Sequence, residues 1–259
     1  MATIARILAP NPGLYTGPGT NTYIVSSGGE ALVIDPGPVI ASHKLEIVAA
    51  LEGLIPVGVV ATHTHPDHAP MANPLAVTLE VPVYGYQDGP SFSPDIRLDD
   101  GDEVGFGSEA ITAIHTPGHT SDHLCFRVGD VLLTGDHIMG GSTVVIEDAA
   151  AYLDSLYLVR DLGVARLEPG HGDAIDDAGA AINEYIEHRM EREQQVLAAV
   201  RGGAGTIGGI VDVVYEGIPV GLREAAVQQV AVQLKKLFDD SAVWFEVGTA
   251  EERTEVRAR

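Results

Sequence analysis

The heptapeptide Thr62-His63-Thr64-His65-Pro66-Asp67-His68 places three imidazoles and a carboxylate within six residues. The apolar run 57–61 directly before it predicts a buried strand. Pro66 suits the first position of a following helix, because its missing N–H would have no partner there. His63 and His65 point the same way in an extended turn, since side chains repeat every second residue. The stretch therefore predicts a strand, a sharp turn and a helix whose four polar groups face one small volume.

Three later segments carry the same residue types in the same setting. His119, Asp136 and His171 each follow a predicted strand, around 110–115, 131–134 and 165–167. Each lies beside a glycine, which lets the backbone approach closely. Taken singly each would be an ordinary turn residue. Because neutral imidazole and carboxylate are preferred ligands of zinc-like ions, together with the heptapeptide they predict a converging metal site.

Length and composition describe a folded, loop-rich protein. The 259 residues are 45% apolar and include 30 glycines and 15 prolines, which allows one large domain or one large and one small. The single cysteine, Cys125, lies in an apolar run and can form no disulfide within the chain, as expected in a reducing compartment. No signal peptide and no membrane span is recognised at the sequence level. We therefore expect a soluble, cytoplasmic protein without a membrane partner.

The charge is strongly acidic, with 15 Lys and Arg against 37 Asp and Glu, or −22. Residues 1–194 hold 8 basic and 28 acidic side chains, so nearly all of the excess lies there. An acidic surface disfavours nonspecific binding to phosphate backbones, which normally requires basic patches. We expect no double-stranded DNA partner.

Several elements can be placed around these motifs. Residues 21–26 and 31–35 predict two strands joined by a turn at 27–29, and a helix capped by Ser42 is expected to about residue 51. Asp35, which ends the second strand, either braces a neighbouring turn or is a simple turn residue; both readings stay open. Further helices are predicted at about 149–162 and 177–200.

The segment Arg201-Gly-Gly-Ala-Gly205 is the clearest linker signal. After it, helices are expected near 206–215 and 222–238, with short strands around 242–246 and 251–256. The predicted domains are a catalytic domain, 1–200, and a small C-terminal domain, 206–259.

At its polar loops the chain resembles the metallo-β-lactamase superfamily of metal-dependent hydrolases. The residues that match the ligand positions of its two-metal members, in order, are His63, His65, Asp67, His68, His119, Asp136 and His171. The resemblance implies an α/β (α+β) fold, a four-layered αββα sandwich with the site at the sheet ends. It also implies two divalent metal ions, with zinc expected first and iron or manganese open, since histidine-rich mixed sites accept all three.

The same resemblance divides the ligands between the two ions. It assigns His63, His65 and His119 to the first metal, Asp67, His68 and His171 to the second, and Asp136 to a bridge. A shared water would then have its pKa lowered towards about 7, and Asp67 would act as the catalytic residue that orients this water or takes its proton. His123 is either a support for the ligand loops or a plain strand histidine.

A finer likeness extends over essentially the whole chain. The segments 11–13, 19–23 and 136–140 and the helix with His188, Arg189, Arg192 and Glu193 resemble β-lactamase-like proteins that carry an added C-terminal winged helix. Some of those relatives are endoribonucleases that act on single-stranded RNA. Arg189 and Arg192 could meet a substrate anion, although pairing with glutamates of their own helix is the favoured expectation.

Four functions are compatible with these residues. Hydrolysis of phosphodiesters in single-stranded RNA is expected first, although the acidic charge opposes it. Thioester hydrolysis, as in hydroxyacylglutathione hydrolases with the same seven ligands, is the alternative, on a small-molecule substrate. β-Lactam hydrolysis is disfavoured by Asp136, because relatives specialised for β-lactams usually lack that bridge. A non-catalytic binding protein is disfavoured by the intact ligand set. The oligomeric state is left open.

Overall fold

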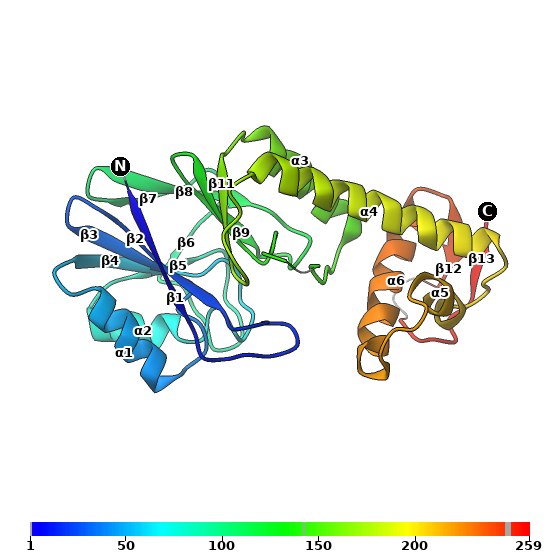
Figure 1. The fold of residues 1–259 in the computed structure, drawn as a ribbon, viewed down its shortest axis with the longest axis horizontal. Helices are drawn as coiled ribbons and strands as arrows, with labels where there is room; N and C mark the ends of the chain where they lie inside the picture. Colours follow the sequence, from blue (N-terminus) through cyan, green and yellow to red (C-terminus); the bar gives the residue numbers. More distant parts are fainter. Residues whose placement is uncertain (1, 142, 247–249) are drawn as a thin grey trace.

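Two β-sheets lie face to face at the centre of the larger part of the molecule, and a pair of helices covers each outer face (Figure 1). The computed structural model describes residues 2–141, 143–246 and 250–259. The sequence of layers is helix, sheet, sheet and helix. The predicted mixed α/β fold, a four-layered αββα sandwich, is confirmed.

The first sheet has six strands in chain order, antiparallel from β1 to β3 and parallel from β3 to β6. The strands are β1 (Thr3–Leu8), β2 (Asn21–Ser27), β3 (Glu30–Ile34), β4 (Ile55–Val60), β5 (Val83–Gly85) and β6 (Ile96–Arg97). The helices α1 (Ala41–Ala50) and α2 (Ala72–Leu79) cover its outer face. The predicted hairpin at its centre is therefore present, as β2 and β3.

The second sheet has five strands in the order β11-β10-β9-β8-β7, and only its β10–β11 pair is parallel. The strands are β7 (Glu103–Phe106), β8 (Glu109–His115), β9 (Leu124–Val128), β10 (Val131–Gly135) and β11 (Arg166–Pro169). The helices α3 (Ala149–Asp161) and α4 (Ala178–Arg201) cover it. Each begins at an aspartate, Asp148 or Asp177, whose carboxylate accepts backbone N–H groups of the first turn.

Alternation along the strands builds the layers. On β2, Ile24 faces the helix layer with Ile47 of α1, while its neighbour Val25 faces the second sheet. Phe126 of β9 belongs to the core between the sheets, and its neighbour Cys125 to the core under α3 and α4. Successive side chains of a strand point to opposite faces, so a strand that is apolar throughout must be covered on both sides.

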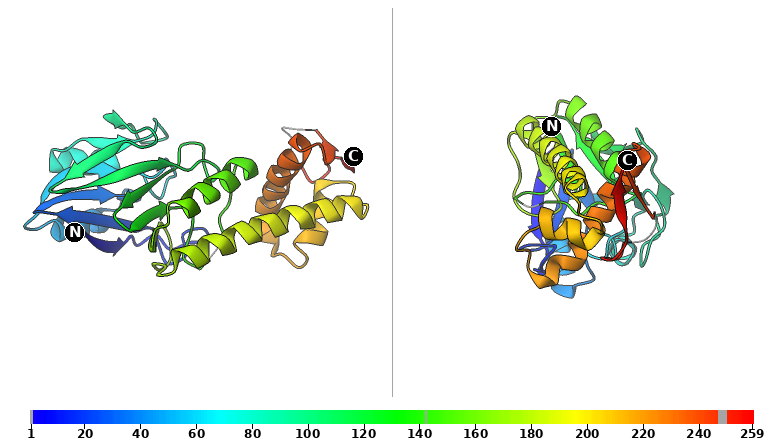
Figure 2. Two further views of the ribbon diagram at one scale, coloured as in Figure 1. Left: turned by 90° about the horizontal axis from the view of Figure 1, so that it is seen from above. Right: turned by 90° about the vertical axis from the view of Figure 1, so that its right-hand side faces the viewer.

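Residues 206–246 and 250–259 form a C-terminal module at the far end of α4 (Figure 2). It contains α5 (Ile207–Val214), a short 3₁₀ turn (Val220–Leu222), α6 (Arg223–Asp239) and the antiparallel pair β12 (Val243–Phe245) and β13 (Val256–Ala258). The last turns of α4 contribute Val196 and Val200 to its apolar core. One helix therefore serves two cores. The domain boundary at residue 200 and the winged-helix character of the module stay predictions.

Three local expectations were wrong. The strand expected around 251–256 lies instead at 256–258, as β13, and residues 252–253 form a turn. Pro66 does not open a helix: α2 begins only at Ala72, and residues 66–69 form a turn closed by N–H groups of His68 and Ala69 to the His65 carbonyl. Ser42 lies inside α1, whose N-cap is Ile40. Among the helices of the described ranges, none combines the length and apolar character needed to cross a membrane.

The packing between the sheets can be tested with Phe126→Ala. Phe126 is 0% exposed, and its truncation should lower the free energy of unfolding by about 3–5 kcal/mol, because the lost contacts leave a cavity. Val77→Ala is the matched control, since Val77 is 80% exposed and should change stability by less than about 0.5 kcal/mol. Urea unfolding of both variants would decide; similar losses would contradict the assigned core.

Candidate metal centre

The predicted ligand residues lie on four loops that follow strands of both sheets. His63, His65, Asp67 and His68 follow β4, His119 lies between β8 and β9, Asp136 follows β10 directly, and His171 follows β11. All four loops meet at one edge of the sandwich, where strand ends of the two sheets lie together. The structure brings all seven side chains into one cluster of two adjoining groups.

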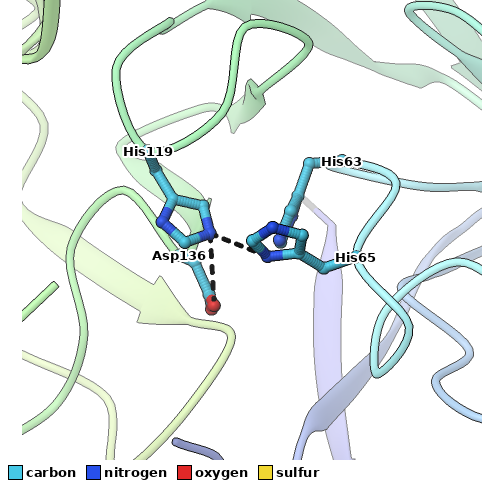
Figure 3. A group of neighbouring side chains, drawn as sticks. All are labelled: His63, His65, His119 and Asp136. Atoms are coloured by element: carbon cyan, nitrogen blue, oxygen red, sulfur yellow. Dashed lines mark hydrogen bonds and ion pairs between the residues drawn. The ribbon is translucent and has the colours of Figure 1, made fainter. Parts of the chain in front are cut away.

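The side chains form two groups, each able to offer one ligand atom per residue within 4.8 Å of the others. The first group is His63, His65, His119 and Asp136, whose side chains converge in Figure 3. The second is Asp67, His68 and His171. His119 Nε2 lies 3.0 Å from His65 Nδ1, and His68 Nε2 lies 3.2 Å from His171 Nε2. Ring nitrogens thus face one another at both centres.

A hydrogen bond on the outward nitrogen orients three of the rings. Nδ1 of His119 contacts the Val145 carbonyl at 2.7 Å, and Nδ1 of His171 contacts the Gly19 carbonyl at 3.0 Å. Nδ1 of His68 lies 2.8 Å from a carboxylate oxygen of Asp35. Because carbonyl and carboxylate oxygens only accept, each Nδ1 donates its proton. In the neutral ring Nε2 then carries a lone pair that faces inward, and this is the form that binds a metal ion.

Two inward atoms have no hydrogen-bond partner at all. His63 Nε2 and Asp136 Oδ1 are buried without one among the described residues. Asp136 Oδ1 nevertheless lies 3.3 Å from Nε2 of both His68 and His171, and its Oδ2 lies 3.7 Å from His119 Nε2. This carboxylate therefore stands between the two groups. Buried polar atoms normally have partners, so these orphaned acceptors fit a site for cations.

The electrostatics of the cluster also favour positive charge. Burial alone would lower the pKa of His68, but the charges of Asp136, Asp35 and Asp67 raise it well above its usual value. Burial opposes the charged form of His171 as well, yet the adjacent carboxylates of Asp136 and Asp67 raise its pKa to about 9. Burial opposes the ionisation of Asp67 and Asp136. Their pKa values nevertheless lie below the usual range, because His68 and His171 stabilise the negative charge.

Asp35 braces the heptapeptide. Its carboxylate accepts hydrogen bonds from the Thr62 N–H and the Thr62 hydroxyl, both at 2.7 Å, in addition to the contact with His68. The residue is 2% exposed and has a φ of +50°, a conformation that aspartate tolerates better than most residues. Of the two readings left open by the sequence, the brace is the one that the geometry supports.

Of the other supports, only His123 was among the expectations from the sequence. The Thr20 hydroxyl donates to Asp67 at 3.1 Å, and the Asp136 N–H lies 3.2 Å from His123 Nε2. His123 is therefore more than a plain strand histidine. A methyl group on Gly170 would lie 2.7 Å from both Asp136 Oδ1 and His68 Cε1, so only glycine fits there without displacing them. Backbone carbonyls and single hydroxyls carry no recognisable sequence pattern, which is why they escaped notice.

A cavity of about 790 Å³ opens beside the cluster. Its walls come from the sandwich, with Tyr15 and Val145, and from the C-terminal module, with Tyr215 and Ile218. Arg189 and Arg192 of α4 also line it.

The expected pairing of these arginines with glutamates of their own helix was wrong. Arg189 donates to the Val144 carbonyl and packs 4.8 Å from the Tyr152 ring centre, while Arg192 donates to the Val214 carbonyl and lies 4.4 Å over Tyr215. Neither has a carboxylate partner among the described residues. Both arginines instead line the cavity.

The brace can be tested with Asp35→Asn, which keeps the size of the side chain and removes its charge. We expect zinc affinity to fall about 10- to 100-fold, because such supporting carboxylates orient ligand histidines and raise their basicity. Calorimetric zinc titration would measure it, with circular dichroism to verify the fold. Asp154→Asn, on the exposed face of α3, is the matched control and should bind zinc like the wild type. Equal affinities of the two variants would refute the role of Asp35.

Comparison with known proteins agrees with this geometry. The family model described as the metallo-beta-lactamase superfamily matches residues 15–171. The Beta-lactamase-like protein 2 homolog of Caenorhabditis elegans is 32% identical, over 93% of this chain and 85% of the relative. An atrochrysone carboxyl ACP thioesterase of Aspergillus chevalieri is 35% identical, over 94% of this chain and 83% of the relative.

Solved structures show the same fold. A beta-lactamase domain protein from Burkholderia ambifaria superposes with a TM-score of 0.83 at 19% identity, over 99% of this chain and 91% of that protein. The likeness therefore includes the C-terminal module as well as the sandwich. With a family match that spans all the strand-end loops and relatives that align over nearly the whole length, the chain belongs to the metallo-β-lactamase superfamily.

Proposed function

We propose that the chain is a hydrolase that depends on two divalent cations. His63, His65 and His119 would hold one cation, Asp67, His68 and His171 the other, and Asp136 would contribute to both. The grouping of the side chains and the inward lone pairs of the anchored histidines support this assignment. Such cations lower the pKa of a coordinated water to about 7 and polarise the bond to be cleaved. Zinc suits the donor set best, and iron or manganese would also fit.

Asp67 is the proposed catalytic residue. Its side chain is 24% exposed, in contrast to 6% for Asp136, and it lines the cavity. One of its oxygens is occupied by the Thr20 hydroxyl at 3.1 Å and by His171 Nε2 at 3.1 Å. The hydroxyl and the imidazole fix the carboxylate, while its exposure lets it reach a water in the cavity. From this position Asp67 can orient the attacking water and accept its proton.

The proposed substrate is a thioester, and the size and lining of the cavity support this proposal. The size of the cavity is in the usual range for a site that encloses a small organic molecule. Apolar side chains that line it include Leu14, Tyr15, Val145, Tyr215 and Ile218. Apolar walls suit an acyl chain, whereas a nucleic-acid strand requires a continuous basic groove. The relative from Aspergillus chevalieri that is named a thioesterase supports the same class.

Cleavage of single-stranded RNA is the second candidate. The observation in its favour is Arg192 stacked over Tyr215 at the cavity, since a cation with an aromatic ring is a common means of binding phosphates and bases. The net charge of −22 and the exposed Glu147 and Glu224 at the cavity oppose a polyanionic substrate. We therefore rank the thioester first.

The reaction can be tested with a panel of acyl thioesters, S-lactoylglutathione, single-stranded RNA and nitrocefin, using zinc-loaded and chelator-treated protein. We expect thioester turnover that is lost on chelation and restored by zinc. Asp67→Asn should lower kcat about 10²- to 10⁴-fold, because the proton acceptor is lost. Asp154→Asn, far from the cluster on α3, should be unaffected. RNA cleavage without thioester turnover would overturn the ranking of the two substrates. If none of the substrates were turned over in a metal-dependent way, the proposal of a metal-dependent hydrolase would be wrong.

A variant of Arg192 can show whether the acyl group of the substrate carries a negative charge. The Arg192 guanidinium is half-buried at the cavity and has no carboxylate partner among the described residues, so it should favour a substrate that carries a carboxylate. Arg192→Gln should raise KM for succinyl thioesters about 10-fold or more and leave KM for butyryl thioesters unchanged. Arg160→Gln, on α3 beside its own Asp161, is the matched control. An equal KM change for both substrates would contradict a charge-specific contact.

A further inference from the structure

Residues 143–147 connect the two parts of the molecule at the metal centre. They belong to the loop between β10 and α3 and lie in neither a strand nor a helix. Val144 and Ile146 are 3% and 2% exposed and belong to the core under α3 and α4. The residue between them, Val145, points its side chain outward. This alternation is that of an extended segment with one buried face.

Three consecutive residues of this segment are held by three different elements. The Val144 carbonyl accepts a 2.6 Å hydrogen bond from Arg189 of α4. Ile146 is paired on both sides with the side-chain amide of Gln229 of α6: its N–H donates at 3.2 Å and its carbonyl accepts at 2.9 Å. The Val145 carbonyl, between them, accepts the bond from His119 Nδ1 at 2.7 Å. The helices of the C-terminal half thus hold the backbone that holds His119.

The side-chain amide of Gln229 pairs with both backbone polar groups of Ile146, as a neighbouring β-strand would. A primary amide offers N–H donors and an oxygen acceptor side by side, so it satisfies both polar groups of Ile146. The adjoining end of the segment is held by the His119 loop, because the Gly118 carbonyl accepts the Glu147 N–H at 2.7 Å. The position of the Val145 carbonyl is therefore set from the sandwich on one side and from α6 on the other.

We propose that Gln229 is a positioning residue for His119, through which the C-terminal module completes the metal centre. The inference rests on the proposed role of His119 as a ligand. The amide fixes Ile146, which fixes the Val145 carbonyl, which in turn holds the ring of His119 with Nε2 directed at His65 and Asp136. Without it the segment gains conformational freedom, and ordering the ring must then be achieved on metal binding.

The test is Gln229→Leu in the full chain, a change to an apolar side chain one bond shorter that removes both hydrogen-bonding groups. We expect the apparent zinc affinity of the group that contains His119 to fall about 10-fold, measured by competition with a chromophoric chelator. Gln194→Leu, on the exposed face of α4, is the matched control and should bind zinc like the wild type. Zinc affinity of Gln229→Leu equal to that of the control would overturn the proposal.

A second measurement does not depend on metal binding. Long-range ¹⁵N–¹H NMR of the histidines in the apo protein should show His119 protonated at Nδ1 in the wild type and in Gln194→Leu, and a mixture of tautomers in Gln229→Leu. If the wild type binds no zinc, iron or manganese, the proposed function fails, and this tautomer measurement alone decides on Gln229. An unchanged tautomer would then overturn the positioning role.

A variant that keeps a polar group guards against misfolding. Gln229→Glu retains an acceptor for the Ile146 N–H but turns a carboxylate towards the Ile146 carbonyl, to which it cannot donate. It should fold, as judged by circular dichroism, and should show the same loss of zinc affinity. If Gln229→Leu is insoluble, this variant decides, and affinity equal to that of Gln194→Leu would refute the proposal.

Discussion

Buried polar side chains must have partners, and this constraint organises the functional edge of the molecule. Five imidazoles and two carboxylates lie together there, most of them with little access to water. Leaving such a polar group without a partner in the protein interior costs roughly several kcal/mol. The fold avoids that cost for three rings by pairing their outward nitrogens with oxygens of other residues. His68 is paired with Asp35, His171 with Gly19 and His119 with Val145. What remains unpaired is directed inward, where cations would supply the missing partners.

The same constraint explains why the site involves so much of the chain. The supporting oxygens come from the end of β3, from the loop after β1 and from the segment before α3. The last of these is held by α4 and α6, so the C-terminal module takes part in the site in two ways. It lines the cavity with Tyr215 and Ile218, and it holds the backbone beside His119. The module is therefore more than an attachment at the end of a long helix.

The charge distribution bears on the choice of substrate. The chain has a net charge of −22, but the cavity carries two arginines that lack carboxylate partners among the described residues. A small acyl substrate with one negative group would meet the local positive charge without approaching much of the acidic surface. A long polyanion would have to cross that surface, where like charges repel.

The sequence by itself determined the fold family and the residue types of the site, because strand-end loops with histidine, aspartate and glycine leave a local pattern that can be recognised in order. Periodicity also located the β2–β3 hairpin and the long helix α4. The sequence was misleading at Pro66, where a turn closed on the His65 carbonyl takes the place of the expected helix start. Tertiary contacts of the site outweigh the local preference of proline there. The sequence was also misleading for Arg189 and Arg192, whose helical spacing suggested glutamate partners.

Only the tertiary structure decided which oxygen orients each imidazole, that Asp35 and His123 support the cluster, and that the C-terminal module completes the cavity. These contacts join residues that are far apart in the chain, as Gln229 and Ile146 do across 83 positions. Many of them use backbone carbonyls, which every residue possesses. A group common to all residues leaves no trace in a sequence, so its role becomes visible only when the folded chain brings its partner to it.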